Sequence, residues 1–153
     1  MEMLQRTERA VEILLVEDNP GDIQLLNLLL KETKLNYKLT TLKDGVEATY
    51  YMFNKVKNSE ATRPDFIILD LNLPRKNGRE VLKELKEDPN TCGIPILILT
   101  TSRANEDIKR CYELHANCYI SKPTELTKFN AVMKSIEDFW FATAELPNIH
   151  SSR

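Results

Sequence analysis

Four polar residues that could carry phosphate or metal chemistry stand at or just after the ends of short apolar runs. They are Asp18, Asp70, Thr100 and Lys122. Asp70, for example, follows four apolar residues that lie between Pro64 and Pro74. Such a run is typical of a strand buried on both faces of a parallel sheet. Aspartates are also common in turns and hydroxyls often cap helices, so no single one of these residues establishes a site.

Two further features surround the first of these residues. Glu17 and Asp18 form an acidic pair directly after the first apolar run. The next residues favour a helix, because Asn19 can cap its start, Pro20 suits its first position and Asp22 lies in its first turn. Acidic residues before a helix also interact favourably with the helix dipole, so a purely structural role for the pair stays open.

Together these residue types describe a phosphoryl acceptor. Glu17, Asp18 and Asp70 would repel one another at one site unless a cation lay between them. Carboxylate and carbonyl oxygens suit Mg²⁺, which also binds phosphate oxygens. Asp70 could then attack phosphorus to form an acyl phosphate. Lys122 and Thr100 would stabilise the transferring group through a positive charge and a hydroxyl donor.

The elements that must bring these residues together alternate along the chain. Apolar runs predict strands at residues 11–16, 37–42, 66–69, 95–99 and 118–120. A helical pattern follows each strand. The first begins at Pro20, the next three cover residues 46–57, 78–87 and 105–114, and the last runs from Thr124 through Trp140. Strands alternating with helices predict an α/β fold with a doubly wound parallel sheet between two helical layers. In the flavodoxin-like strand order 2-1-3-4-5, strands 1, 3, 4 and 5 are neighbours and their polar ends meet at one edge.

Apolar stripes indicate which side chains of two helices are buried. In residues 46–57 the stripe comprises Val46, Tyr50, Phe53 and Val56. In the last helix it comprises Leu126, Phe129, Val132, Met133, Ile136, Phe139 and Trp140. Phe141 lies off this stripe, so we expect an exposed aromatic face and a homodimer formed by the last helix and its neighbours, with a monomer as the alternative.

Composition restricts the class of protein. The 153 residues fit one domain, and a formal net charge of -2 offers no basic surface for nucleic acid or anionic membranes. No run is long and apolar enough for a membrane span, and the first ten residues lack the apolar core of a signal peptide. Three cysteines without metal-site spacing fit a reducing compartment, so we expect a cytoplasmic protein. We expect one folded domain at 11–144, an N-terminal extension at 1–10 and a tail at 145–153, without a DNA-binding or enzymatic domain after it.

Between Val11 and Trp140 the chain resembles the receiver domains of two-component response regulators. The resemblance rests on Glu17-Asp18, Ile67-Ile68-Leu69-Asp70-Leu71-Asn72-Leu73-Pro74, Gly78, Thr100 and Tyr119-Ile120-Ser121-Lys122-Pro123. It implies that a sensor histidine kinase donates a phosphoryl group to Asp70. It further implies that Asp18, Asp70 and the Asn72 carbonyl hold Mg²⁺, and that Glu17 acts through coordinated water.

The resemblance also implies how the signal leaves the site. Phosphorylation would draw the Thr100 hydroxyl toward the phosphoryl group and let Tyr119 turn inward, which changes the surface around the fourth helix, fifth strand and fifth helix. The Lys122–Pro123 peptide bond would be cis. The protein would be a phosphoacceptor that catalyses only its own phosphotransfer and slow dephosphorylation, with its output an unknown downstream protein or a further phosphorelay.

A narrower resemblance concerns the small response regulators that pair with bacterial and cyanobacterial phytochromes. It rests on the residues from Asp70 through Leu82, on Tyr112 through Tyr119, and on Phe139-Trp140. It implies a phytochrome as the donor kinase. His115 lies within the second of these stretches, and as a single histidine at a helix end it also fits a structural role.

Two other functions use similar residues. A haloacid-dehalogenase-like phosphatase also forms an acyl phosphate on Asp with Mg²⁺, but it needs a second Asp two residues later as general acid. Asn72 stands at that position and cannot exchange a proton in the same way. A flavodoxin-like flavin carrier needs uncharged donors around phosphate in its first loop, whereas Glu17 and Asp18 would repel it.

Overall fold

Five parallel strands form one sheet in the computed structural model, which describes residues 9–147. The strands are β1 (Val11–Val16), β2 (Tyr37–Leu42), β3 (Phe66–Leu69), β4 (Ile96–Thr100) and β5 (Cys118–Ser121). Their order is β2-β1-β3-β4-β5, and every neighbouring pair is parallel. The predicted α/β fold and its flavodoxin-like strand order are confirmed.

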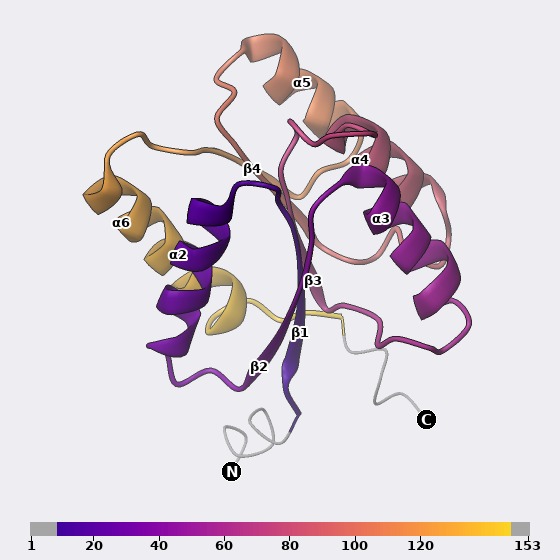
Figure 1. Cartoon of the computed structure of the whole chain (residues 1–153), viewed down its shortest axis with the longest axis horizontal. Coiled ribbons are helices and arrows are strands. Elements are labelled where there is room, and N and C mark those ends of the chain that lie inside the picture. The colour runs from indigo at the N-terminus through magenta and orange to yellow at the C-terminus, as the bar shows by residue number, and fades with distance from the viewer. Residues whose placement is uncertain (1–8, 148–153) are drawn as a thin grey trace.

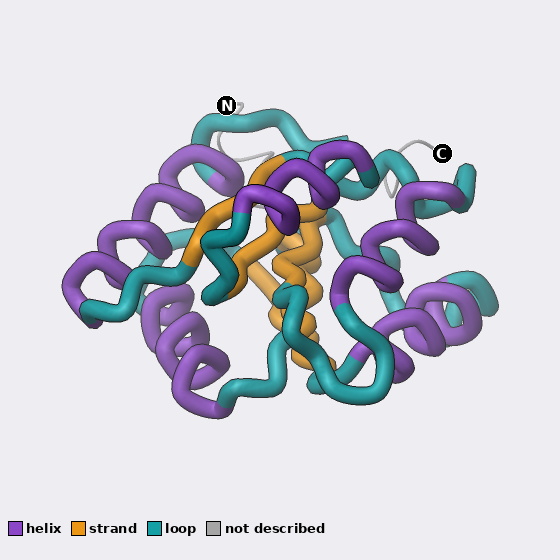
Figure 2. Tube along the Cα trace, turned by 90° about the horizontal axis from the view of Figure 1, so that it is seen from above, coloured by secondary structure: helices purple, strands orange, loops and turns teal. Residues whose placement is uncertain are grey.

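Helices cover both faces of this sheet, which makes three layers (Figures 1 and 2). They are α2 (Pro20–Lys31), α3 (Gly45–Tyr50) with its π-helical continuation η1 (Tyr51–Val56), α4 (Gly78–Glu87), α5 (Asn105–Glu113), and α6 (Leu126–Ile136) with its continuation η2 (Glu137–Phe141). In Figure 1, α2 and α6 lie side by side on one side of the strands, and α3 and α4 lie on the other.

Alternating side chains of the strands divide the core into two clusters. Leu14, Ile67 and Ile98 belong to the cluster that packs beneath α3, α4 and α5. Ile13 and Ile68 belong to the cluster beneath α2 and α6. Successive residues of a strand point to opposite faces, so a continuous apolar run is what a two-sided sheet requires.

Capping residues fix the start of the helices that follow β1, β2 and β3. The Asn19 side chain accepts a hydrogen bond from the Asp22 backbone at the start of α2. Asp44 caps α3 in the same way. Asn77 and Glu80 form a reciprocal capping box at the start of α4. These caps hold the loops that leave the carboxyl ends of the strands.

Parts of both predicted apolar stripes are wrong, and the π-helical turn η2 accounts for the difference at the end of the last helix. Tyr50 is 56% exposed, whereas Met52 is buried. In η2, Phe139 is 55% exposed and Phe141 packs edge-to-face on Phe66, with ring centroids 5.1 Å apart. A π turn closes over five residues instead of four, so it shifts the phase of every side chain after it. The exposed aromatic residue of the last helix is therefore Phe139, not Phe141. Leu126, at the start of that helix, is also exposed.

β2 is one edge of the sheet and is only partly buried, as its weaker alternating pattern predicts. Within residues 9–147, no helix is both long and apolar enough to span a membrane.

Candidate functional site

The carboxyl ends of four neighbouring strands bring the predicted site residues to one edge of the sheet. Glu17 and Asp18 follow β1, Asp70 follows β3, and Lys122 follows β5. Thr100 is the last residue of β4 and is completely buried. Backbone hydrogen bonds hold this edge together, from Asp70 N–H to the Val16 carbonyl at 3.0 Å and from Lys122 N–H to the Thr100 carbonyl at 2.6 Å.

Three carboxylates form the acidic part of this edge. Glu17, Asp18 and Asp70 each offer one oxygen within 4.8 Å of the others. Glu17 and Asp70 are buried, and Asp18 is exposed. Burial raises the pKa of Glu17 from 4.5 to about 7, and the charge of Asp70 acts in the same direction against the hydrogen bond from Lys122. A group of this kind could hold a hard cation through its oxygens.

Lys122 is the cation that the structure places among these carboxylates. Its ammonium donates hydrogen bonds to Glu17 Oε1 at 2.6 Å and to Asp22 Oδ2 at 2.8 Å, and it lies 3.7 Å from Asp70 Oδ2. Burial lowers the pKa of Lys122, but the hydrogen bonds to Asp22 and Glu17 outweigh it and raise this pKa overall. The sequence predicts Asp22 only as a residue in the first turn of the helix after β1. This position is the one signal that its side chain could reach this edge.

The loop after β3 passes very close to the start of α4. The Asn72 backbone N–H donates to Asp70 Oδ1 at 3.4 Å, and the Asn72 side chain is exposed. Gly78 N–H donates to the Leu71 carbonyl at 2.8 Å. A Cβ atom on Gly78 would lie 2.1 Å from the Asp70 carbonyl oxygen, so only glycine fits there without a shift. Gly78 therefore lets the loop that carries Asp70 pack against α4.

The two predicted switch residues contact the loop that follows β4. The Thr100 hydroxyl oxygen accepts a hydrogen bond from Ser102 N–H at 3.5 Å. The Tyr119 hydroxyl donates to the Ser102 carbonyl at 3.1 Å, and the Ser121 hydroxyl donates to the same oxygen at 3.0 Å. Tyr119 thus lies on β5 beside this loop and packs against the α3–α5 side of the core.

A charged network extends the same loop to α4 and α5. The Ser102 hydroxyl donates to Asp107 Oδ2 at 2.6 Å, and Arg79 Nη2 donates to Asp107 Oδ1 at 2.6 Å. The hydrogen bonds from Ser102 and then Arg79 lower the pKa of Asp107. Sequence reasoning missed Arg79 and Asp107, because they are separated along the chain and no motif joins them.

The expected cis bond between Lys122 and Pro123 is wrong. No peptide bond among residues 9–147 is cis. The trans form of an X–Pro bond is intrinsically favoured by about 0.5–1 kcal/mol. In this trans arrangement the Lys122 carbonyl accepts a hydrogen bond from Arg103 Nη2 at 3.3 Å.

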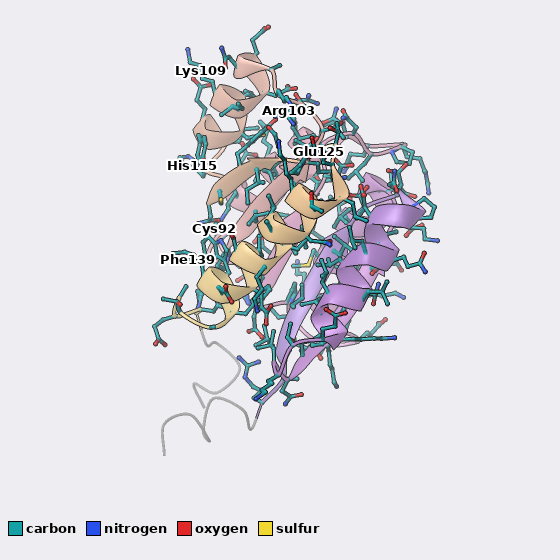
Figure 3. The ribbon with its side chains drawn as sticks, turned by 90° about the vertical axis from the view of Figure 1, so that its left-hand side faces the viewer. Cys92, Arg103, Lys109, His115, Glu125 and Phe139 are labelled. Atoms are coloured by element: carbon teal, nitrogen blue, oxygen red, sulfur yellow. The ribbon has the colours of Figure 1, made fainter. Side chains whose placement is uncertain are left out.

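A groove of about 600 Å³ opens beside the site, between α2 and the start of α6. Its lining includes Asp22 and Lys122, and the apolar side chains of Leu28 and Leu126, both exposed, contribute to its wall. Arg103, labelled in Figure 3, also lines this groove, and its guanidinium donates to the Lys122 carbonyl. The groove therefore joins an apolar surface to the charged edge of the sheet.

Comparisons with known proteins agree with this geometry. The model of the response regulator receiver domain matches residues 13–134. Response regulator Rcp1 of Synechocystis sp. is 42% identical over 135 residues, which cover 88% of this chain and 92% of that protein. Similar solved structures include two response regulators. The phosphorylated cyanobacterial phytochrome response regulator RcpA has 44% identity and a TM-score of 0.87, covering 92% of this chain and 100% of that chain.

The Mn²⁺-bound form of response regulator Rcp1 has 41% identity and a TM-score of 0.86, covering 90% of this chain and 99% of that chain. These matches do not support the haloacid-dehalogenase-like phosphatase that the acyl-phosphate residues left as an alternative. Fold, arrangement of the acidic edge and relatives agree, and the chain belongs to the response regulator receiver domain family.

Proposed function

We propose that this response regulator accepts a phosphoryl group on Asp70 from a sensor histidine kinase. The observation that carries the proposal is the surrounding of Asp70: a buried carboxylate within 4.8 Å of two others, with the Lys122 ammonium 3.7 Å away. Such crowding is costly for stability and is typical of a functional site. The phosphorylated structure of RcpA supports the same chemistry in a similar protein.

Glu17, Asp18 and Asp70, together with the Asn72 backbone carbonyl, would hold a divalent cation, which we propose is Mg²⁺. The donors are all oxygens, and the raised pKa of Glu17 reflects buried negative charge that a cation would compensate. The Mn²⁺-bound form of Rcp1 supports a divalent metal here. When bound, the cation would neutralise charge on the phosphoryl oxygens.

The residues of the chain then supply the transfer itself. An Asp70 carboxylate oxygen attacks the phosphorus of a phosphohistidine, a P–O bond forms, and the P–N bond to the imidazole breaks. Lys122 and the Thr100 hydroxyl donate to the phosphoryl oxygens. Water would later hydrolyse the acyl phosphate slowly, and we propose that this transfer and this hydrolysis are the only reactions that the protein promotes.

The loop after β4 would carry the signal to the surface. Thr100 and Tyr119 both bond to Ser102 in this structure, so a Thr100 hydroxyl drawn to the phosphoryl group must release the Ser102 N–H. That release would change the position of Tyr119 and the surface formed by α5, β5 and α6. A downstream protein would bind the changed surface.

The donor kinase would dock in the groove between α2 and α6. The groove reaches Lys122 and carries the exposed apolar residues Leu28 and Leu126, which a helix of the donor could cover. We propose that the donor is a phytochrome, which is supported by the similarity to the phytochrome response regulator RcpA.

We further propose that residues 11–144 form the receiver domain, that the protein is cytoplasmic, and that it forms a homodimer through α6 and η2. The first strand begins at Val11, and the turn that follows the last helix is closed by a hydrogen bond from Ala144 N–H to the Phe139 carbonyl. The cysteines are free, which fits a reducing compartment. Exposed Phe139 supports an interface at η2.

Intact mass spectrometry after incubation with acetyl phosphate and Mg²⁺ tests the function. The wild type should gain one phosphoryl group, and Asp70→Asn should gain none. Omission of Mg²⁺ with added chelator should also abolish the gain. A phosphoryl group on the Asp70→Asn variant would place the acceptor elsewhere.

A further inference from the structure

The buried ammonium of Lys122 donates hydrogen bonds to two of the three carboxylates near it, Glu17 and Asp22, and not to Asp70. Its side chain is only 5% exposed, and it donates to Glu17 Oε1 at 2.6 Å and to Asp22 Oδ2 at 2.8 Å. Asp70 Oδ2, at 3.7 Å, is beyond hydrogen-bonding distance. An ammonium has three N–H donors, so one donor is left for a group near Asp70.

Glu17 and Asp22 differ in what else surrounds them. Glu17 belongs to the group of three carboxylates that would hold a cation, whereas Asp22 lies outside that group. A cation beside Glu17 would weaken the attraction between Glu17 and Lys122. Asp22 is therefore the partner that can keep holding Lys122 while the cation is bound.

Both backbones of the Asp22–Lys122 pair are held in place. Asp22 N–H donates to Asn19 Oδ1 at 3.0 Å, and Pro20 restricts the first turn of α2. Lys122 N–H donates to the Thr100 carbonyl at 2.6 Å. The Asp22 side chain is 24% exposed, so the contact is largely shielded from water. The Asp22–Lys122 ion pair is therefore held in one geometry, unlike an ion pair between two mobile side chains on the surface.

We propose that Asp22 is a positioning residue for phosphoryl transfer, which holds the Lys122 ammonium beside Asp70 but beyond hydrogen-bonding distance of the Asp70 carboxylate. The inference rests on the proposed function. Without Asp22, the nearest further anion for Lys122 is Asp70. A direct hydrogen bond from Lys122 to Asp70 would hold an oxygen of the attacking carboxylate and would remove the Lys122 ammonium from the phosphoryl oxygens.

The test measures the rate of phosphorylation by acetyl phosphate at saturating Mg²⁺ for wild type, Asp22→Asn and Asp22→Glu. We expect Asp22→Asn to react about tenfold or more slowly, because small displacements of a catalytic group cost large factors in rate. Asp22→Glu keeps the carboxylate and should recover part of the loss. Mn²⁺ affinity, measured separately, should change by less than about threefold, because Asp22 lies outside the group of three carboxylates.

The same substitution in a Lys122→Ala protein separates the positioning of Lys122 from a general effect of the Asp22 charge. If Asp22 acts through Lys122, Asp22→Asn should cause no further loss of rate in a Lys122→Ala protein. Glu47→Gln is the matched control, because Glu47 also lies in the first turn of a helix. Its side chain accepts a hydrogen bond from Lys43 N–H and its backbone N–H donates to Asp44, so Glu47 does not contact Lys122 through these bonds. This control should react at the wild-type rate.

Three results would overturn the inference: a wild-type rate for Asp22→Asn, the same fold loss for Asp22→Asn with and without Lys122, or an equal loss for Glu47→Gln. Failure of the wild type itself to gain a phosphoryl group at Asp70 would instead contradict the proposed function. The two failures are therefore distinguishable.

Discussion

At the scale of single residues, Glu17 shows what it costs to bury a carboxylate at this edge of the sheet. Its pKa rises from 4.5 to about 7, chiefly because the carboxyl is buried. Between these values the folded protein binds a proton that the unfolded chain has released. The contribution of Glu17 to the free energy of unfolding is therefore highest below pH 4.5 and falls as the pH rises through about 7.

Glu17→Gln should remove the loss of stability that Glu17 causes as the pH rises. Urea unfolding in the presence of chelator, at about pH 5 and about pH 8, should show that the variant gains stability relative to wild type at the higher pH. Parallel stabilities of the two proteins across this range would contradict the account of Glu17.

The residues that could be predicted from the sequence share one property. Asp18, Asp70 and Lys122 follow an apolar strand closely, and parallel strands bring their carboxyl ends to the same edge. Asp22 and Asp107 could not be predicted in this way, because their contacts depend on how far a side chain reaches from one helix to another loop. Hydrogen bonds across elements have no periodic signal in a sequence.

At the scale of elements, the contact of α4 with the loop after β3 holds Asp70 in place. A Cβ atom at Gly78 would lie 2.1 Å from the Asp70 carbonyl oxygen, whereas one at Gly93 would meet nothing within 4 Å. Gly78→Ala should therefore lower the free energy of unfolding by about 1–3 kcal/mol through overpacking. It should also slow phosphorylation, because the backbone of Asp70 must shift.

Gly93→Ala provides the matched control for the same chemical change. Denaturant unfolding and the acetyl phosphate rate should both stay close to wild type. Equal effects of the two substitutions would show that the close approach at Gly78 does not matter.

Strand positions could be predicted within one residue, whereas the course of two helices could not. Buried strands need continuous apolar runs, and such runs are visible in the sequence at β1 and β3. The π turns η1 and η2 have no comparable pattern. Whether Phe139 or Phe141 is buried depends on packing against Phe66, which only the folded chain determines.

At the scale of the whole molecule, the alternation of strands and helices predicts a parallel sheet between two helical layers, but association of two copies does not follow from a fold. Exposed Phe139 points away from the sheet at the end of the last helix (Figure 3). A homodimer that buries this aromatic should sediment as a dimer at tens of micromolar.

Phe139→Ser should shift the protein toward the 17.7 kDa monomer. Tyr50→Ser is the matched control, because Tyr50 is equally exposed but lies on α3. Sedimentation of the wild type only as a monomer, or equal dissociation by both substitutions, would refute the proposed interface.

The most direct test of the central claim is to locate the acyl phosphate chemically. Wild-type protein is incubated with acetyl phosphate and Mg²⁺ and reduced with sodium borohydride, which converts an aspartyl phosphate to homoserine, and its peptides are sequenced by mass spectrometry. The account predicts homoserine at position 70 alone, and none after chelation of the metal. Homoserine at any other position, or at no position, would contradict it.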